Sequence, residues 1–512
     1  MRERRPRAPS QARRRPRRRR RRQATGRRAD GSIGKGSLAS RHRIARGGLG
    51  AGWRLGAATK ARWPSADMLA GRRGVVPGSP RAHRFAPPPA IRLRWADLPK
   101  RASTMKIYAF PGIRYRTAEP GSLAAPPFDQ IGERLRIQLH AASPHHFSHL
   151  TRPAPDSEDA HQHARRLHEE WLASGVVAAD PTPAVYPYAI EERSGNRRLG
   201  LIALVGVGPG SEADLRPHEH TVDKPLADRL ALLEATAVDL EPVFYLAEDD
   251  GSLEALLQAD AASGELVEHR DPHGNRHRLY RVDDPARIER YRSTLAERTA
   301  AIADGHHRTK VAQMFARKHS VPEGRAGSAK MAVITSITSR GLQIDPIHRG
   351  ITRELDPELL RQHVVSATPF EGDDGAAFAA AVDAAQPPSL GAWIGDRGPE
   401  IWRLDPSAGP SDMPGREAAL PAVLLQYQLL AACGLTLANA SDGTLVYRSD
   451  PDELWQERRG GELPAAFFLP TMSPEAFALA TSGGDVLPPK STRFLPKQVS
   501  GLVWCSHDAE LA

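Results

Sequence analysis

The chain has 512 residues, of which 71 are basic and 60 acidic, so its net charge is +11. Residues 1–104 hold 30 of the basic and 4 of the acidic residues, which leaves 41 basic and 56 acidic residues from Met105 onward. The positive charge therefore belongs to the leader, residues 1–104, and is no evidence that the acidic remainder binds nucleic acid.

The leader contains an almost unbroken arginine run at residues 13–22 and has no helix or strand periodicity. Such dense like charge opposes folding, so we expect a disordered Arg-rich leader. One interpretation is an arm that binds RNA or DNA by neutralising phosphates. The favoured interpretation is that translation starts at Met105, because residues 105–110 resemble the opening strand of a domain.

From Met105 on, short apolar strands alternate with amphipathic helices, which predicts a mixed α/β fold. Strands are predicted at residues 106–110, 199–207, 243–247, 278–282, 330–337, 391–394, 400–404, 444–447 and 465–469. Helices are predicted at residues 158–173, 225–238, 253–259, 285–303, 306–318, 357–365, 375–384, 421–433 and 474–481. Loop-rich stretches at residues 321–328 and 405–415 predict a border near Arg325, between an N-terminal region, 105–325, and a C-terminal region, 326–512.

No stretch has the pattern of a secretion signal or a membrane span. The charged start is not followed by an apolar core, and the most apolar stretch, 418–438, is interrupted by Pro421 and two glutamines. The two cysteines, Cys433 and Cys505, are too few for a disulfide framework or a four-cysteine zinc site. We therefore expect a cytoplasmic protein that does not enter a membrane.

The most informative segment is Asp304-Gly305-His306-His307-Arg308, which places an acid, a glycine, two imidazoles and a guanidinium at a predicted helix–helix junction. The glycine permits a tight turn, the following helix offers N–H groups to an anion, and the arginine can bind phosphate oxygens. The acid can hold magnesium or accept a proton, and either histidine can carry protons. This combination predicts a phosphate-binding loop.

A purely structural interpretation of this loop is a polar helix cap with solvated histidines. The common phosphate loops are absent, since no segment fits G-x-x-x-x-G-K-[ST] and the glycines at 206–210 have the wrong spacing for a dinucleotide fingerprint. Any nucleotide must therefore bind to a less common fold.

Several further segments resemble those of the bacterial and archaeal domain of unknown function 1015 family. The resemblance runs from Met105 nearly to the C-terminus. Its segments are the opening 105–115, Ala-Pro-Pro-Phe-Asp at 125–129, Pro-His-Glu-His-Thr at 217–221, Ala-Asp-Gly-His-His-Arg at 303–308, Pro-Ile-His-Arg at 346–349, Pro-Lys-Ser-Thr at 489–492, and Pro-Lys at 496–497 with Ser-Gly-Leu-Val at 500–503.

The loop at 304–308 is also similar to that of ParB-like proteins, a group with kinases of free serine and CTP-binding partition proteins. This resemblance implies a ParB-like nucleotide-binding core with an additional C-terminal α/β region. It implies a nucleotide cofactor, ATP or ADP, with Mg²⁺ held by Asp304, and two candidate acids, Asp129 and Glu219, one of them a general base. The residues expected to bind the nucleotide or substrate are Gly305, His306, His307, Arg308, Lys490, Ser491, Thr492 and Lys497.

Three departures from the family pattern concern the substrate more than the fold. Thr309 and Lys310 follow the loop where an aromatic residue is usual, and Phe128 replaces the commoner tyrosine. A Leu-Glu-Pro motif is expected on the helix at 421–433, where this chain has Gln-Tyr-Gln instead.

Three functions are compatible with these residues. The first is a small-molecule kinase that uses a nucleotide to phosphorylate a hydroxyl metabolite such as free serine. The second is a non-catalytic nucleotide-binding switch, and the third is a metal-dependent phosphatase built from Asp304, His306, His307 and His348. The acidic body shows no basic stripe, so no nucleic-acid partner is expected for the folded part.

Overall fold

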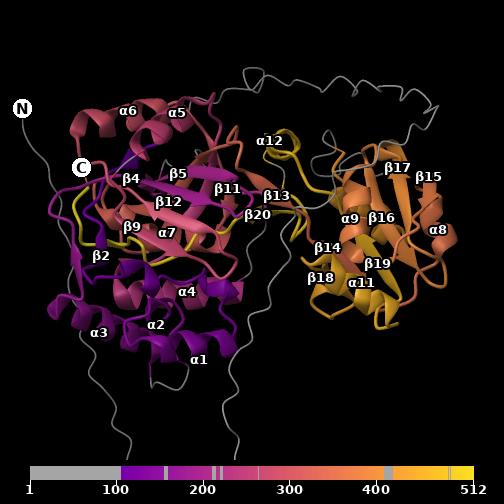
Figure 1. Cartoon of the computed structure of the whole chain (residues 1–512), viewed down its shortest axis with the longest axis horizontal. Helices are drawn as coiled ribbons and strands as arrows, with labels where there is room; N and C mark the ends of the chain where they lie inside the picture. Colours follow the sequence, from indigo (N-terminus) through magenta and orange to yellow (C-terminus); the bar gives the residue numbers. More distant parts are fainter. Residues whose placement is uncertain are drawn as a thin grey trace, which may run out of the picture. The chain divides into compact units, whose positions relative to one another are not determined.

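The structure of the protein is a computed structural model, which describes residues 105–154, 159–209, 215–219, 223–262, 264–408, 419–482, 484 and 486–511. These residues belong to one compact unit, Pro87–Ala512. The expectation of a disordered leader concerns residues that lie outside those described. The fold is mixed α/β, as predicted, and it contains a nine-stranded and a six-stranded sheet (Figure 1).

The nine-stranded sheet has the order β6-β11-β8-β12-β5-β4-β10-β9, and β1 pairs with the end of β5. Its two central strands, β5 and β12, are antiparallel, whereas β12 and β8 are parallel. The strands are β1 (Ile107–Tyr108), β4 (Tyr186–Glu191), β5 (Arg197–Gly206), β6 (Leu215–Arg216), β8 (Val243–Ala247), β9 (Val267–Arg270), β10 (Arg276–Leu279), β11 (Ala300–Asp304) and β12 (Ala329–Ser336).

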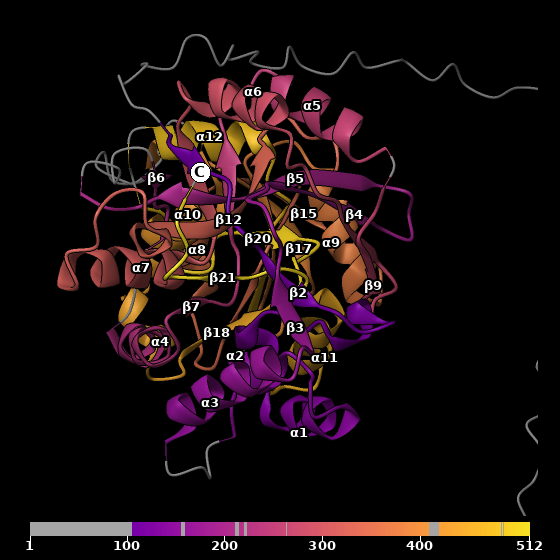
Figure 2. The same cartoon turned by 90° about the vertical axis from the view of Figure 1, so that its left-hand side faces the viewer.

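The central strands are apolar on both faces because both faces of the sheet are covered. Consecutive residues of β5, such as Leu201 and Ile202, face opposite sides of the sheet and belong to two different buried clusters. Helices α5 and α6 lie on one side of the sheet and helices α1 to α3 on the other (Figure 2). The helices of this part are α1 (Glu133–Ala142), α2 (Ser148–Thr151), α3 (Ala160–Ala173), α4 (Asp223–Thr236), α5 (Ser252–Asp260), α6 (Pro285–Leu295) and α7 (His306–Lys318).

The six-stranded sheet is antiparallel throughout and has the order β15-β17-β16-β19-β14-β18. Phe378 of α9 and Trp455 of α11 pack against one of its faces. The strands are β14 (His348–Ile351), β15 (Val364–Pro369), β16 (Ser389–Ile394), β17 (Glu400–Leu404), β18 (Leu445–Arg448) and β19 (Ala465–Phe468). The helices are α8 (Pro357–Arg361), α9 (Gly375–Asp383), α10 (Pro421–Leu424), α11 (Pro451–Arg459) and α12 (Pro474–Ser482), and α10 continues into a π-helical stretch, Leu425–Leu430.

The last part of the chain returns from the six-stranded sheet to the first region. Its strand β20 (Arg493–Leu495) pairs with β13 (Gln343–Asp345), and its strand β21 (Cys505–Ser506) pairs with β7 (Val238–Asp239). A further short pair joins β2 (Ile113–Tyr115) to β3 (Val177–Ala179). The nine-stranded sheet takes strands from both sides of Arg325, since β12 follows that residue and lies at the centre of the sheet.

The prediction of one helix over residues 285–303 was wrong, and the error affects the site. Helix α6 ends at Leu295, and β11 occupies Ala300–Asp304 between β6 and β8. A short apolar run has no periodicity that separates a buried strand from a helix, so its neighbours in the sheet decide. Asp304 therefore ends a strand, and the junction at Gly305 is strand-to-helix.

Among the described residues, no helix is both long enough and apolar enough to cross a membrane.

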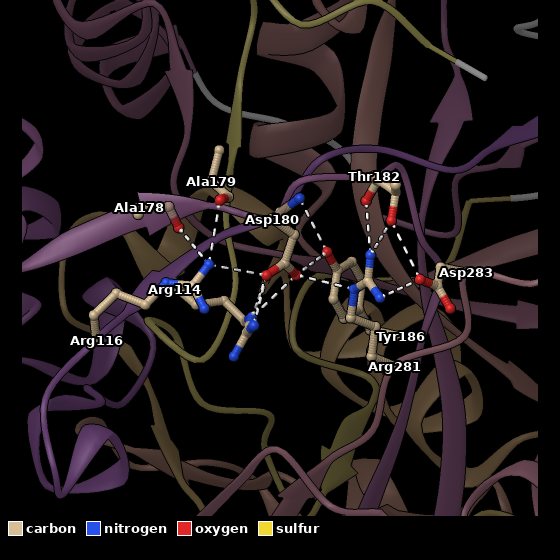
Figure 3. A network of polar contacts seen from close by, with 10 residues as sticks. Arg114, Arg116, Ala178, Ala179, Asp180, Thr182, Tyr186, Arg281 and Asp283 are labelled. Atoms are coloured by element: carbon tan, nitrogen blue, oxygen red, sulfur yellow. Dashed lines mark hydrogen bonds and ion pairs between the residues drawn. The ribbon is translucent and has the colours of Figure 1, made fainter.

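A buried aspartate ties the amino-terminal strands to the nine-stranded sheet (Figure 3). The side chain of Asp180 is 1 % exposed, and it contacts the guanidinium groups of Arg114 at 2.5 Å, Arg116 at 3.1 Å and Arg281 at 3.4 Å. The hydroxyl of Tyr186, on β4, donates to the same carboxylate at 2.8 Å. Burial alone raises the pKa of Asp180, but the hydrogen bonds from Arg114 and Tyr186, together with the charges of Arg114 and Arg281, outweigh burial and lower it.

Replacing Asp180 with asparagine should lower the free energy of unfolding by about 3 kcal/mol at pH 7, because three cations lose their shared carboxylate. The folded-state pKa is lowered, so this stabilisation is present above the ordinary aspartate value of about 4 and is lost as the pH falls below it. Urea denaturation of both proteins at pH 7 and pH 3 should show the difference shrinking. As a matched control, Asp283→Asn removes an exposed partner of Arg281 and should cost less than about 1 kcal/mol; equal losses in the two variants would contradict a special role for Asp180.

Candidate functional site

The Asp304–Arg308 loop, residues 304–308, joins β11 to α7 and requires glycine at its second position. Gly305 has a φ of 93° and is the N-cap of α7, which has no side-chain cap. A Cβ atom at this position would lie 2.5 Å from Cγ1 of Val243 on β8. The turn thus brings the amino-terminal end of α7, with its backbone N–H donors and positive dipole end, next to the sheet.

Asp304 faces cations. Its Oδ2 atom accepts a hydrogen bond from Lys497 Nζ at 2.9 Å and lies 4.0 Å from Arg308 Nη2. Burial raises the pKa of Asp304, but the charges of Lys497 and Arg308 prevail and lower it to about 2. The carboxylate is therefore ionised and already committed to Lys497, a residue that the resemblance assigned to ligand binding.

His306 is buried and holds one proton. The backbone N–H of His218 donates to His306 Nε2 at 3.3 Å, so the remaining proton is on Nδ1. Burial lowers the pKa of His306 well below its usual value, and the nearby His218 lowers it further. The protonated Nδ1 lies 3.9 Å from Oε2 of Glu219. His306 is thus a neutral group that faces the candidate base.

Glu219 is held by the Lys-Ser-Thr loop, residues 490–492. The backbone N–H of Lys490 donates to Glu219 Oε1 at 2.6 Å, and Lys490 itself adopts a left-handed backbone with a φ of 63°. Ser491 donates to the carbonyl of Pro488, and Thr492 Oγ1 lies 2.8 Å from His218 Nε2. The two hydroxyls of this loop therefore bind protein groups, and the loop brings the end of the chain to the acid.

Arg308 does not extend into solvent. Its side chain is 10 % exposed, and Nη1 donates to the carbonyl of Pro242 at 2.8 Å. Asp129, the other candidate acid, is exposed on a short 3₁₀ turn, Phe128–Gln130, and lies near enough to interact electrostatically with His307 and Arg308. The structure thus brings both predicted acids to the Asp304–Arg308 loop, and it buries the predicted arginine.

Sequence reasoning missed Glu241. The Leu-Glu-Pro motif expected on the helix at 421–433 occurs instead at residues 240–242, directly before β8. Glu241 is 5 % exposed, and its Oε1 accepts hydrogen bonds from Phe128 N at 3.0 Å and Ser500 Oγ at 3.1 Å. Burial raises its pKa against the opposing charge of Arg308. A motif search along the whole chain, not confined to one helix, would have found it.

A pocket between α4 and α7 continues from Arg308 into the protein. Half of its lining residues are aliphatic, and its charged groups are Arg229, Asp239, Glu241, Arg308 and Lys330. The other lining residues are Leu232, Leu233, Val238, Leu240, Val311, Ala312 and His507. Lys330 is buried and bonded to both Asp239 and the carbonyl of Glu241. Arg308 therefore belongs both to the Asp304–Arg308 loop and to the lining of this pocket.

Magnesium on Asp304 would have to displace Lys497, whose Nζ donates to Oδ2 of that carboxylate. Across the ranges that the structure describes, no group of three His, Cys, Asp or Glu side chains could hold a metal. His348, a proposed metal ligand for the phosphatase alternative, lies on β14 and accepts a hydrogen bond from Leu469 N.

Replacing Gly305 with alanine should destabilise the protein by about 1–3 kcal/mol, because the new Cβ meets Val243 and the backbone stays left-handed. Gly251 provides a matched control, since it is the N-cap of α5, has a φ of 100° and has open space where a Cβ would lie. Gly251→Ala isolates the backbone strain, so chemical denaturation should show a larger loss for Gly305→Ala. Equal losses would mean that the loop moves freely away from β8.

Comparisons with known proteins place the chain in a family whose function is unknown. No curated protein matches it. It is similar to a conserved hypothetical protein from Pyrococcus furiosus (13 % identity, 58 % of this chain and 94 % of that chain, TM-score 0.29). It is also similar to free serine kinase in complex with AMP (13 %, 57 % and 87 %, TM-score 0.30) and to SbnI with a C-terminal truncation from Staphylococcus aureus (13 %, 58 % and 85 %, TM-score 0.30). The model of the family described as "Protein of unknown function (DUF1015)" matches residues 107–389, more than half of the sequence, and the chain belongs to this family.

Proposed function

We propose that the protein is a nucleotide-dependent phosphotransferase, a kinase that acts on a small hydroxyl metabolite such as free serine. One observation carries the proposal: the carboxylate of Glu219 lies beside the amino-terminal end of α7, with Oε2 3.9 Å from Nδ1 of His306. A candidate proton acceptor and a candidate phosphate-binding turn therefore occupy the same place. Phosphoryl transfer requires little more than such positioning and charge neutralisation.

The phosphates of the nucleotide would bind at the start of α7. This helix has no side-chain cap, and its backbone N–H groups and dipole favour an anion. Lys497 and Arg308 add positive charge next to Asp304. A phosphate that attracts Lys497 would compete with Asp304 for it, so the lysine is available to follow charge that develops during transfer.

The nucleoside part of ATP or ADP would lie over the opening of the pocket between α4 and α7, because the cavity, at about 60 Å³, is too small to enclose a base. Arg308 lines this pocket and also belongs to the phosphate-binding turn, so one molecule can contact both. The aliphatic side chains of Leu232, Leu233 and Val311 suit the flat apolar face of a base.

Glu219 would act as the general base. Lys490 N–H binds Oε1, which leaves Oε2 to face the acceptor hydroxyl. The proton of the acceptor hydroxyl moves to Glu219 while the hydroxyl oxygen bonds to the terminal phosphorus of the nucleotide. The bond from that phosphorus to the bridging oxygen breaks. ATP then leaves as ADP, or ADP as AMP, and the metabolite carries the phosphate. Asp129 lies on an exposed turn, whereas Glu219 is fixed by the loop, so Glu219 is the better candidate.

Replacing Glu219 with glutamine should lower kcat for serine phosphorylation by about 10²- to 10⁴-fold, because the acceptor hydroxyl loses its base. The dissociation constants of ATP and ADP, measured by isothermal titration calorimetry, should remain within about threefold of the wild-type values, because glutamine has nearly the same shape as glutamate. Asp129→Asn is the matched control and should retain most of the activity. A strong loss in the Asp129 variant, with Glu219→Gln unaffected, would exchange the two roles.

Replacing Arg308 with alanine should abolish detectable binding of ATP and ADP to the full chain, because this residue serves both the phosphates and the nucleoside. The Arg493→Ala variant, which loses a partly buried arginine outside the pocket, should bind normally. Tight binding by the wild-type protein without turnover of any hydroxyl acceptor would favour the non-catalytic switch. No binding of either nucleotide to the wild-type protein would contradict both functions.

A further inference from the structure

Arg349, on β14, is a buried cation held by backbone carbonyls. The residue is 3 % exposed, and its guanidinium lies 4.5 Å from the ring centroid of Tyr447 on β18. It donates hydrogen bonds to the carbonyls of Ile347, of Pro489 at 3.3 Å and of Lys490 at 3.1 Å. Among the described residues, no carboxylate lies within ion-pair distance of it. Burying a cation costs free energy unless other groups replace its water. For Arg349 these groups are backbone carbonyls, so their identity indicates what the residue does.

The carbonyl of Pro489 belongs to the same peptide group as the N–H of Lys490. This peptide is therefore bound at both ends: its oxygen accepts from Arg349, and its N–H donates to Glu219 at 2.6 Å. The positive charge of Arg349 next to the oxygen polarises the peptide group, which strengthens its N–H as a hydrogen-bond donor. The two hydrogen bonds also fix the plane of a peptide whose following residue, Lys490, is held in the left-handed region.

The connection joins the two sheets. Arg349 comes from the six-stranded sheet, and Glu219 follows β6 of the nine-stranded sheet. Glu219 is also the acid whose charge acts on the Arg349 guanidinium, together with the hydroxyl of Tyr447. A cation whose only task was to anchor β14 would have no need to bind the Pro489–Lys490 peptide.

We propose that Arg349 is a positioning residue for Glu219, which it orients through the Pro489–Lys490 peptide. The inference rests on the proposed function, because Glu219 is there the general base. It assigns to the C-terminal sheet a part in catalysis: the sheet holds the donor that sets one oxygen of the base and so directs the other oxygen toward the acceptor.

The test compares Arg349→Gln, Arg349→Lys and the matched control Arg448→Gln in the full-length chain. Arg448 lies on the neighbouring β18 and pairs with Glu457, so its loss perturbs the same sheet without reaching the loop. For Arg349→Gln we expect kcat for serine phosphorylation to fall about 10- to 100-fold, with KM for ATP changed less than threefold, because the base is misplaced and the nucleotide site is intact. Arg349→Lys keeps the charge and should recover part of kcat, and it remains informative if the glutamine variant does not fold.

Hydrogen exchange measured by mass spectrometry gives a second readout that needs no turnover. In Arg349→Gln, exchange should accelerate in the peptide that contains residues 488–492, whereas Arg448→Gln should leave it unchanged. Unaltered exchange in the Arg349 variants, or an equal fall of kcat in the Arg448 control, would overturn the positioning role. If the wild-type protein phosphorylates nothing but exchange still accelerates, the proposed function fails while the link from Arg349 to the loop stands.

Discussion

The buried carboxylate of Glu241 connects segments that are far apart in the chain. A carboxylate removed from water must find hydrogen-bond donors, and here they come from the backbone of Phe128 and the hydroxyl of Ser500. Its own carbonyl accepts from Lys330 on β12, and the next carbonyl, of Pro242, accepts from Arg308. The early turn, the central sheet, α7 and the end of the chain therefore meet at one residue.

The distribution of charge around α7 follows from the same geometry. Gly305 turns the chain so that the positive end of the helix lies against β8, and Asp304 holds Lys497 and Arg308 close to this turn. Asp304 is ionised and offsets part of the charge of Lys497, and His306 is neutral, so the positive potential at the turn comes from Lys497, Arg308 and the N–H groups of the helix. Each of these protonation states results from burial together with a defined partner, not from the residue type alone.

The C-terminal region is part of the site as well as of the fold. Lys490 binds Glu219, Thr492 contacts His218, and Lys497 pairs with Asp304. Lys490, Thr492 and Lys497 lie beyond residue 389, where the match to the family model ends. The loop at 490–492 is itself fastened to the six-stranded sheet through Arg349. A site divided between two sheets depends on both of them being folded, so mutations in the distant sheet can reach the candidate base.

The sequence by itself determined the α/β class, the bounds of β8 and α7, and the family, because apolar periodicity and short motifs are local features. It did not show that residues 300–304 form a strand, since a short apolar run acquires its conformation from the strands beside it. Nor did it reveal Glu241, which binds Phe128, or the role of Arg349, which binds Pro489, because each of these pairs is more than a hundred residues apart in the chain. Only the tertiary structure decides such contacts, because burial and hydrogen bonding depend on which distant segments pack together.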